Sequence, residues 1–440
     1  MENNYTYLKL LQSKDISFWD VKAYLQRSVS SQYKMERLQN LLIEHSKKTK
    51  LFEKPEENFK ILGVNNQDGL FDAYIEKGKN INQPYKKVED GYFAYNPYRI
   101  NVGSIGLKSD KQKYDYISPA YVVFSCKNDL YPQYLEILLK TKYFAQAIRH
   151  NTTGSVRQTL GFDNLCNISI PLPSVEKQKE LVSEYEHLQN FATQKEEDAK
   201  KIENSIDDYL LSELGIEHID ISNDKKTLFR LVNYMDLNKW IIPDNIEQFT
   251  SSKYNFVTFG NIVKEGPSYG ANVKGCSIDN GCRYIRITDI NDDGSLNNDI
   301  AYPERIDNRY LLKENDFLIA RSGATVGKTF LYKDKFGKCI YAGYLVRYRL
   351  KDCIVPEFLF YYTHSSVYKL WVVKNQRVAA QPNINGQEYL NFPLIVPSLK
   401  TQEAIIKEID NKKEKIQKLR NESEQFKQQA ISNFEQEVFN

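Results

Sequence analysis

The chain repeats itself, and this duplication constrains its fold more than any other feature of the sequence. At an offset of about 221 residues, the segment that begins at Trp19 aligns with the segment that begins at Trp240. The correspondence continues co-linearly, and further along it pairs Gly106 with Gly327. Self-similarity at a fixed offset is the signature of a repeated structural unit. The sequence therefore predicts two copies of one domain.

Each copy divides into the same three parts. Aromatic and apolar runs with glycine turns, such as 116–128 and 338–350, predict strands over the first two-thirds of each copy. A helical piece then follows a proline, over 132–150 in the first copy and 356–374 in the second. A long charged helix comes last. Strands and helices in separate runs predict an α+β chain.

The long helices begin with the same proline-rich entry. The pattern P-x-x-x-x-Q spans Pro173 to Gln178 in the first copy and Pro397 to Gln402 in the second. Ser174 and Ser398 stand where an N-cap belongs, because a serine hydroxyl can accept a hydrogen bond from a free N–H of the first turn.

Apolar residues in both long helices recur at alternating steps of four and three, which is a heptad pattern. Two such seams in one chain predict an antiparallel coiled coil, in which each helix buries the seam of the other. The alternative, two amphipathic helices that each pack on their own domain, stays open. The predicted seam consists of Leu181, Tyr185, Leu188, Ala192, Ile202, Ile206, Ile405, Ile409, Ile416, Leu419, Phe426 and Ala430.

These patterns divide the chain into four segments. Two homologous globular domains cover residues 1–170 and, with a linker, 216–395. Two long helical spacers cover 171–215 and 396–440. The predicted architecture is a pseudo-two-fold internal repeat in which the antiparallel helices separate the two domains.

Two stretches resemble catalytic motifs but fail on spacing. A phosphate-binding P-loop needs four residues between its first glycine and the Gly-Lys pair, whereas only three separate Gly323 from Gly327. A strand–turn–strand element is the better interpretation. The sequence Asn96-Pro97-Tyr98 lacks one proline of the Asn-Pro-Pro-Tyr motif of amino-methyltransferases, and a turn explains it. The chain is therefore not expected to be an enzyme.

Composition excludes several other classes of protein. The six cysteines form no C-x-x-C pair, and the five histidines are scattered, so no metal site is expected. No apolar stretch reaches 18 residues and no signal peptide is visible, which predicts a cytoplasmic protein without a membrane partner.

Charge is distributed in blocks along the chain. Residues 1–169 carry 24 Lys and Arg against 18 Asp and Glu, and residues 251–395 carry 19 against 14. Residues 170–250 carry 9 against 17. Two mildly basic, tyrosine-rich blocks suit a polyanion such as DNA, although an ordinary solvated surface explains them equally well.

On these residues the sequence resembles the specificity subunit of type I restriction-modification systems. The resemblance rests on the entries "IPLPSVEKQKELV" and "FPLIVPSLKTQEAII", on the glycine segments "VGSIGL" and "SGATVGKT", and on the in-register duplication. It implies a non-catalytic subunit in which each domain, called a target-recognition domain, reads one half of a split double-stranded DNA site. The helices fix the distance between the half-sites. Two modification subunits dock on the helices and carry S-adenosylmethionine, restriction and motor subunits can join, and this chain itself holds no cofactor.

Candidate DNA contacts are basic, amide or hydroxyl residues in the basic blocks, because such side chains bind base edges or phosphates. Tyr121 and Tyr344, which align across the repeat, are instead expected to pack in the core. In the first domain the candidates are Asn96, Arg99, Asn101, Ser104, Arg149, Asn151, Thr152, Ser155, Arg157 and Gln158. In the second they are Tyr269, Asn272, Lys274, Arg321, Ser322, Thr325, Lys328, Lys374, Gln376, Arg377 and Gln381.

Two other functions stay open. The chain could be the recognition subunit of a different DNA-methylating defence assembly with the same layout. It could also be a coiled-coil adaptor protein whose globular ends bind proteins and not DNA.

Overall fold

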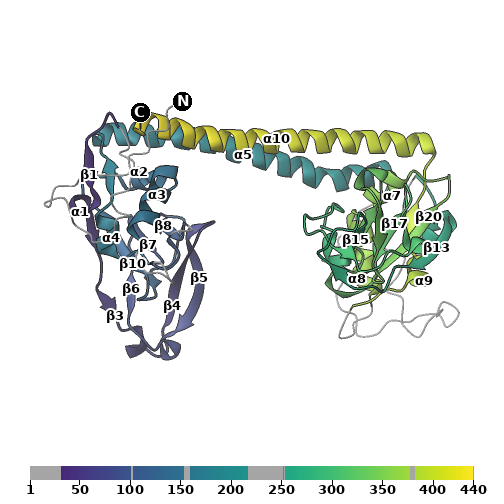
Figure 1. The fold of residues 1–440 in the computed structure, drawn as a ribbon, viewed down its shortest axis with the longest axis horizontal. Coiled ribbons are helices and arrows are strands. Elements are labelled where there is room, and N and C mark those ends of the chain that lie inside the picture. The colour runs from purple at the N-terminus through teal and green to yellow at the C-terminus, as the bar shows by residue number, and fades with distance from the viewer. Residues whose placement is uncertain are drawn as a thin grey trace. The chain divides into compact units, whose positions relative to one another are not determined.

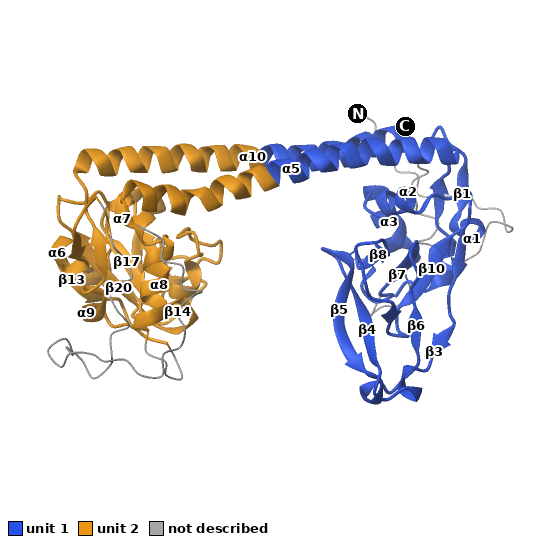
Figure 2. Ribbon diagram, turned by 180° about the vertical axis from the view of Figure 1, so that it is seen from behind, with its two compact units in different colours: residues 1–196, 421–440 blue, residues 197–420 orange. Residues whose placement is uncertain are grey.

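The computed structural model describes residues 31–100, 103–152, 159–216, 251, 253–376 and 382–439. The chain forms two compact units (Figure 2). Unit 1 consists of residues 1–196 with 421–440, and unit 2 consists of residues 197–420. Both divisions fall inside the two long helices, so each unit contains part of each helix.

Unit 1 is built on an antiparallel four-stranded sheet in the order β2-β10-β7-β8, with short helices packed beside it (Figure 1). A second, five-stranded sheet has the order β3-β6-β9-β4-β5. The elements are β1(Met35–Arg37), α1(Leu38–Leu41), β2(Leu42–Glu44), β3(Lys48–Thr49), β4(Asn58–Asn65), β5(Gly69–Lys77), β6(Tyr85–Lys87), β7(Tyr92–Tyr95), β8(Ile105–Leu107), β9(Tyr116–Ile117), β10(Val122–Cys126), α2(Pro132–Leu138), α3(Lys142–Asn151), α4(Phe162–Cys166), β11(Ser169–Pro171) and α5(Val175–Glu213), the last of which continues into unit 2.

Unit 2 is built on a second antiparallel four-stranded sheet, in the order β13-β20-β17-β18. Two small two-stranded sheets, β14-β16 and β15-β19, stand where unit 1 has five strands. The elements are β12(Phe256–Thr258), α6(Phe259–Ile262), β13(Val263–Tyr269), β14(Gly275–Cys276), β15(Arg283–Ile285), β16(Tyr302–Pro303), β17(Phe317–Ala320), β18(Thr329–Leu331), β19(Cys339–Tyr341), β20(Leu345–Leu350), α7(Pro356–Tyr362), α8(Ser366–Asn375), α9(Gly386–Tyr389), β21(Pro393–Ile395) and α10(Leu399–Phe439), which continues into unit 1.

The two units share a frame of equivalent elements in the same chain order. The sheets correspond strand by strand, with β2, β10, β7 and β8 matching β13, β20, β17 and β18. The strand pair β1-β11 likewise matches β12-β21, and α2, α3 and α4 match α7, α8 and α9. These elements of the frame thus occur in both units in the same order, as the aligned sequence segments do.

Strand pairing corrects one detail of the sequence alignment. Tyr95 pairs with Ile105 in unit 1, and Ile319 pairs with Thr329 in unit 2. This register makes Gly103, and not Gly106, the counterpart of Gly327. Both residues have left-handed backbones, with φ of 88° and 86°. A conformation that favours glycine recurs at this turn, whereas the sequence comparison followed the nearest glycine and was wrong by three residues.

Both stretches that resemble catalytic motifs form turns, as predicted. Residues 317–331 form the hairpin β17–β18 around a short 3₁₀ turn at Gly323–Thr325, so the P-loop interpretation is excluded here. In unit 1, Asn96 begins a turn in which its side-chain oxygen accepts a hydrogen bond from the backbone N–H of Tyr98, at 3.0 Å.

Each predicted helical piece after a proline is in fact two helices. The two helices are separated at a residue whose hydroxyl forms hydrogen bonds with nearby backbone groups in place of the helical ones. Thr141 donates its hydroxyl to the carbonyl of Leu138 and accepts from the N–H of Phe144, so it ends α2 and caps α3. Ser365 makes the same pair of contacts between α7 and α8. Hydroxyl side chains favour caps for this reason, and apolar periodicity alone does not show it.

The glutamines of the P-x-x-x-x-Q pattern are fully buried and make equivalent hydrogen bonds in the two units. Gln178 accepts from the N–H of Tyr131 at 2.7 Å and donates to the carbonyls of Asp129 and Pro173 at 2.9 and 3.0 Å. Gln402 accepts from the N–H of Val355 at 2.7 Å.

Gln402 also donates to the carbonyls of Cys353 and Pro397, at 3.1 and 2.8 Å. Each glutamine therefore ties the first turn of a long helix to the loop that precedes α2 or α7. The adjacent serines act as N-caps, as predicted, since Ser174 and Ser398 accept from N–H groups of the first turn at 3.3 and 3.2 Å.

Within unit 1, the start of α5 packs antiparallel against the end of α10. The Phe191 and Phe426 rings stack with centroids 5.7 Å apart, and Tyr185 meets Phe434 edge to face. Ser423 donates its hydroxyl to the carbonyl of Ala192 at 2.8 Å. Small side chains at this position allow the two backbones to approach each other closely.

Within unit 2, the end of α5 packs against the start of α10 in the same antiparallel sense. Lys412 donates to the hydroxyl of Ser205 at 3.3 Å, and Arg420 pairs with Glu203 at 2.8 Å. All twelve residues of the predicted seam are buried or partly buried. Ile405 and Ile409 belong to the core cluster of unit 2 as well as to the seam.

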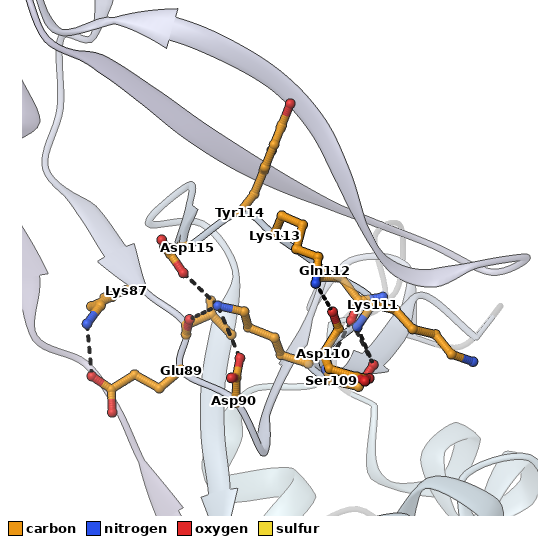
Figure 3. A network of polar contacts seen from close by, with 12 residues as sticks. Lys87, Glu89, Asp90, Ser109, Asp110, Lys111, Gln112, Lys113, Tyr114 and Asp115 are labelled. Carbon is orange, nitrogen blue, oxygen red and sulfur yellow. Dashed lines mark hydrogen bonds and ion pairs between the residues drawn. The ribbon is translucent and has the colours of Figure 1, made fainter.

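The turn between β6 and β7 is held by a lysine whose side chain is only 4% exposed. The Lys108 ammonium donates to the carbonyl of Val88 at 3.0 Å and to the carboxylate of Asp115 at 2.7 Å. Asp90 lies 3.5 Å away. Figure 3 shows this network, with Asp90 and Asp115 on either side of the amine.

Unit 2 uses a different side chain at the same backbone position. In unit 1 the backbone carbonyl of Lys108 accepts a hydrogen bond from the N–H of Gly91, and in unit 2 the carbonyl of Tyr332 accepts one from the N–H of Asn315. Tyr332 is therefore the counterpart of Lys108. The Tyr332 hydroxyl donates to the carbonyl of Gly337 at 2.6 Å. Gly91 and Asn315 both have left-handed backbones, with φ of 83° and 69°.

Candidate nucleic-acid interface

Four chain segments of unit 2 meet where β13, β17 and β20 end or begin. The N–H of Arg321 donates to the carbonyl of Tyr344, and the N–H of Ile384 donates to the carbonyl of Arg321, both at 3.0 Å. The N–H of Gly386 donates to the Tyr269 hydroxyl at 3.1 Å. A side chain at Gly270 would lie 2.3 Å from two carbonyl oxygens, so this close approach requires glycine.

The side chain of Arg321 is held between two exposed aromatic rings. Its guanidinium carbon lies 5.1 Å from the ring centroid of Tyr269 and 5.8 Å from that of Tyr344. Its Nε donates to the carbonyl of Gly343 at 3.2 Å. The distances from the guanidinium carbon to the two ring centroids are within the range of a cation–π contact. We call Tyr269, Arg321 and Tyr344 the Arg321 cluster.

The position of Tyr344 contradicts the expectation that it packs in the core, since its side chain is 52% exposed. Strand register explains the difference. Val122 pairs with Tyr95 in unit 1, and Val346 pairs with the equivalent residue Ile319 in unit 2. Val122 is therefore the counterpart of Val346, and two residues earlier Ala120 is the counterpart of Tyr344. Because successive residues of a strand face opposite sides, a shift of one residue moves the ring from the core to the surface. Tyr121, by contrast, packs against a core cluster, as predicted.

Other predicted contacts of unit 2 have varied surroundings. Asn272 and Lys274 are exposed on the loop after Tyr269, and Lys374 is exposed near the end of α8. Gln376 is half-buried and ends α8 through a backbone hydrogen bond to Val372.

Three further candidates of unit 2 take part in local structure. Thr325 donates its hydroxyl to the carbonyl of Ser322 at 3.3 Å. Lys328 pairs with Asp292 at 2.8 Å, and this hydrogen bond holds the pKa of the Asp292 carboxyl below its usual value. Ser322 is 2% exposed, and its hydroxyl has no partner among the described residues.

The corresponding loop of unit 1 has another character. The N–H of Leu160 donates to the carbonyl of Pro97 at 3.0 Å, so Pro97 takes the place that Arg321 has in unit 2. Asn96 is half-buried in its turn, whereas Arg99 is exposed. Ser104 is 4% exposed. The predictions for Ser104 and Ser322 are wrong in this conformation, because a buried hydroxyl cannot reach a DNA backbone.

The end of α3 supplies three more candidates of unit 1. Arg149 is exposed in the last turn. The side chains of Asn151 and Thr152 donate hydrogen bonds to carbonyls at the end of the helix, those of Ala147 at 2.8 Å and Arg149 at 2.9 Å. The remaining candidates lie outside the described residues: Asn101, Ser155, Arg157, Gln158, Arg377 and Gln381.

Over the ranges that the structure describes, no group of three or more His, Cys, Asp or Glu side chains could hold a metal ion. In the same ranges, none of the helices combines the length and the apolar character that crossing a bilayer demands.

Comparison with known proteins identifies the domain in unit 2. Residues 254–428 match the family model of the type I restriction modification DNA specificity domain. A curated relative, the type I restriction enzyme EcoBI specificity subunit of Escherichia coli, is 26% identical over 183 residues. That match covers 40% of this chain and only 38% of the length of the relative.

One solved structure shares the fold over nearly the whole chain. A chain from a structure described as the basis of complex assembly and conformational transition of the type I R-M system matches with a TM-score of 0.57, at 15% identity, over 94% of this chain and 99% of its own length. The HsdS subunit from Thermoanaerobacter tengcongensis covers similar shares, 93% and 97%, also at 15% identity, but with a TM-score of 0.45. Residues 254–428 therefore carry a type I restriction modification DNA specificity domain, within a chain whose fold resembles that of a chain from a type I R-M system.

Proposed function

We propose that this chain is the DNA-reading, non-catalytic subunit of a type I restriction-modification complex. It binds a bipartite double-stranded site, and one target-recognition domain reads each half-site. The observation that carries the proposal is the frame that unit 1 shares with unit 2, because residues 254–428 of the second copy match a DNA specificity domain.

Partner subunits supply the chemistry in this proposal. Two modification subunits dock on the long helices and bring S-adenosylmethionine, and restriction subunits join them for cleavage. In this proposal the recognition domains cover residues 1–170 and 216–395, and the helical spacers cover 171–215 and 396–440. The cytoplasmic location stays a prediction.

Methylation mapping tests this function directly. The full chain is co-expressed with its modification subunit in a host without other adenine methylation, and modified adenines are mapped across the genome. We expect one split motif with a constant gap. Methylation without a split motif, or none at all with a folded complex, would contradict the proposal.

We also propose that α5 and α10 form a coiled coil that sets the length of the gap. The two helices have 39 and 41 residues. One added heptad lengthens a helix by about 10 Å, since the rise is about 1.5 Å per residue. That length corresponds to about three base pairs of duplex at about 3.4 Å each.

The paired side chains indicate where the heptads belong. Lys195 and Glu422 form an ion pair at 2.6 Å, so one heptad is inserted after each of these residues. We expect the mapped gap to lengthen by about three base pairs, with both half-sites unchanged. A matched control replaces exposed residues at the same positions without changing the length. An unchanged gap in the insertion variant would remove the spacer role.

The alternative of a coiled-coil adaptor makes a different prediction. A DNA reader binds duplex less tightly as salt rises, because phosphate contacts release counterions. The complex should therefore show a steep salt dependence of duplex binding, whereas an adaptor should bind little duplex at any salt concentration.

A further inference from the structure

We propose that Arg321 reads a guanine in the half-site bound by unit 2, and that Tyr269 and Tyr344 position its guanidinium for this contact. The inference rests on the proposed function and deepens it, since it names a specificity-determining residue and the base that it recognises. Three observations carry it: the partners of the guanidinium, its remaining hydrogen-bond donors, and the counterpart of Arg321 in unit 1.

Arg321 differs from the arginines that stabilise unit 2. Arg286, Arg309 and Arg349 each pair with carboxylates, at 2.5 to 3.1 Å. Among the described residues, Arg321 has no ion pair, and tyrosine rings flank it instead. A ring orients the cation without neutralising it, so the charge remains available to an acceptor outside the chain.

The contacts of Arg321 leave one edge of the guanidinium unused. Its backbone is fixed on both sides by hydrogen bonds to Tyr344 and Ile384, and Nε is bound to the carbonyl of Gly343. The two terminal nitrogens have no partner among the described residues. Two parallel donors match the O6 and N7 acceptors of guanine in the major groove, which is the commonest specific arginine contact. A side chain that is already ordered loses less entropy on binding.

The neighbouring rings lie at the surface, as this role requires. Tyr269 is 42% and Tyr344 52% exposed. The Tyr269 hydroxyl is occupied by the N–H of Gly386, which fixes that ring in place. Pro97 stands at the equivalent position of unit 1 and has no donor side chain. We therefore expect the arginine–guanine contact in one half-site only.

The test uses the purified complex of the full chain with its modification subunit. Methylation is measured on duplexes that carry each of the four base pairs at every position of both half-sites. We expect Arg321→Lys to lower discrimination at a single G·C pair by about 5- to 150-fold, the range for one bidentate contact. The variant retains the positive charge but not the planar pair of donors. The other half-site should be unchanged.

Variants of the ring separate positioning from folding. Tyr344→Ala should weaken discrimination at the same base pair, and Tyr344→Phe, which keeps the ring, should leave it intact. Arg309→Lys is the matched control, because Arg309 is exposed and paired with Asp307, and it should change no position. Hydrogen exchange at the residues of unit 2 checks that this unit remains folded.

Other outcomes overturn the inference. If Arg321→Lys or Arg321→Gln weakens binding equally for all sequences, Arg321 contacts phosphate or supports the fold. For a phosphate contact, Arg321→Gln should also reduce the salt slope by about one. Unchanged methylation in both variants would exclude any contact with a base. A wild-type complex without a split motif would contradict the proposed function itself, whereas a wild-type motif that Arg321 variants leave intact contradicts this inference alone.

Discussion

Units 1 and 2 use the same frame but different side chains at the positions that the frame presents. The four-stranded sheets have matching strand order, and Gln178 and Gln402 make the same three hydrogen bonds. The side chains of the loop after β7 or β17 differ, with a proline turn in unit 1 and the Arg321 cluster in unit 2. Duplication has preserved what holds each unit together, while the surface loops have diverged.

The largest effects should come from the shared frame. Replacing Gln178 with Leu leaves the buried carbonyl of Pro173 and two partly buried groups, the carbonyl of Asp129 and the N–H of Tyr131, without this partner. A buried group without a partner costs about 1–3 kcal/mol. We expect unit 1 to lose about 3 kcal/mol or more in its free energy of unfolding. Gln402→Leu should cost unit 2 a similar amount. Hydrogen exchange assigns the loss to the correct unit.

The control for the glutamine variants is Gln428→Leu, at an exposed position of α10. Exposed substitutions usually change stability by about 0.5 kcal/mol or less. If Gln178→Leu were no more costly than this control, the buried hydrogen bonds would not hold the helix entry.

The second comparison concerns Lys108 and Tyr332, which occupy equivalent positions. Lys108→Met should cost unit 1 about 2–3 kcal/mol, because it leaves the carbonyl of Val88 unpaired and two carboxylates without their cation. Tyr332→Phe removes one hydrogen bond and should cost unit 2 about 1 kcal/mol. Denaturant unfolding with hydrogen exchange measures both values. Equal losses would show that the ammonium contributes no more than a hydroxyl.

A smaller effect is expected at the left-handed turn shared by Gly91 and Asn315. A side chain at Gly91 would meet no atom within 4 Å, so only backbone conformation opposes substitution there. Gly91→Ala should cost about 1–2 kcal/mol, and Gly91→Asn should cost less, because asparagine adopts this conformation more readily. Thermal unfolding ranks the variants, and the reverse order would refute the explanation.

The smallest effect concerns pH. Burial lowers the pKa of His364 in unit 2, and of His45 in unit 1, below the usual value of 6.5. The folded state then binds a proton less readily than the unfolded chain. Stability from the neutral ring is present above pH 6.5 and is lost as pH falls below it. His364→Asn should remove this dependence from unit 2 alone, as measured by hydrogen exchange between pH 5 and 7.5; no change would contradict the assignment.

The repeated frame was largely predictable, because its signals are periodic and occur twice. Heptad spacing predicted the helices, and the repeated P-x-x-x-x-Q pattern indicated a common entry. The five-stranded sheet of unit 1 was not predicted, because only its parallel pair β4-β9 has an equivalent in unit 2, the pair β15-β19, and the other strands do not repeat. The splits at Thr141 and Ser365 were missed because apolar periodicity continues across them.

The candidate site was harder to predict, since contacts depend on which face of a strand a residue occupies. Tyr269 and Arg321 were both selected as candidate contacts, and the structure brings them together. Tyr344 was missed as a member of the cluster because the alignment was shifted by one residue. Ser104 and Ser322 were selected as candidate contacts because they carry hydroxyl groups. Both side chains are buried in the structure, which their residue type alone does not indicate.

The hydrogen bond accepted by the carbonyl of Pro97 or Arg321 has an evolutionary consequence. The hydrogen bond that both units share at this position is accepted by a main-chain oxygen, an atom that all twenty amino acids possess. Mutation can therefore exchange the side chain there at little risk to folding. Selection for a new target sequence could act on such a residue first, while the rest of the protein stays as it is.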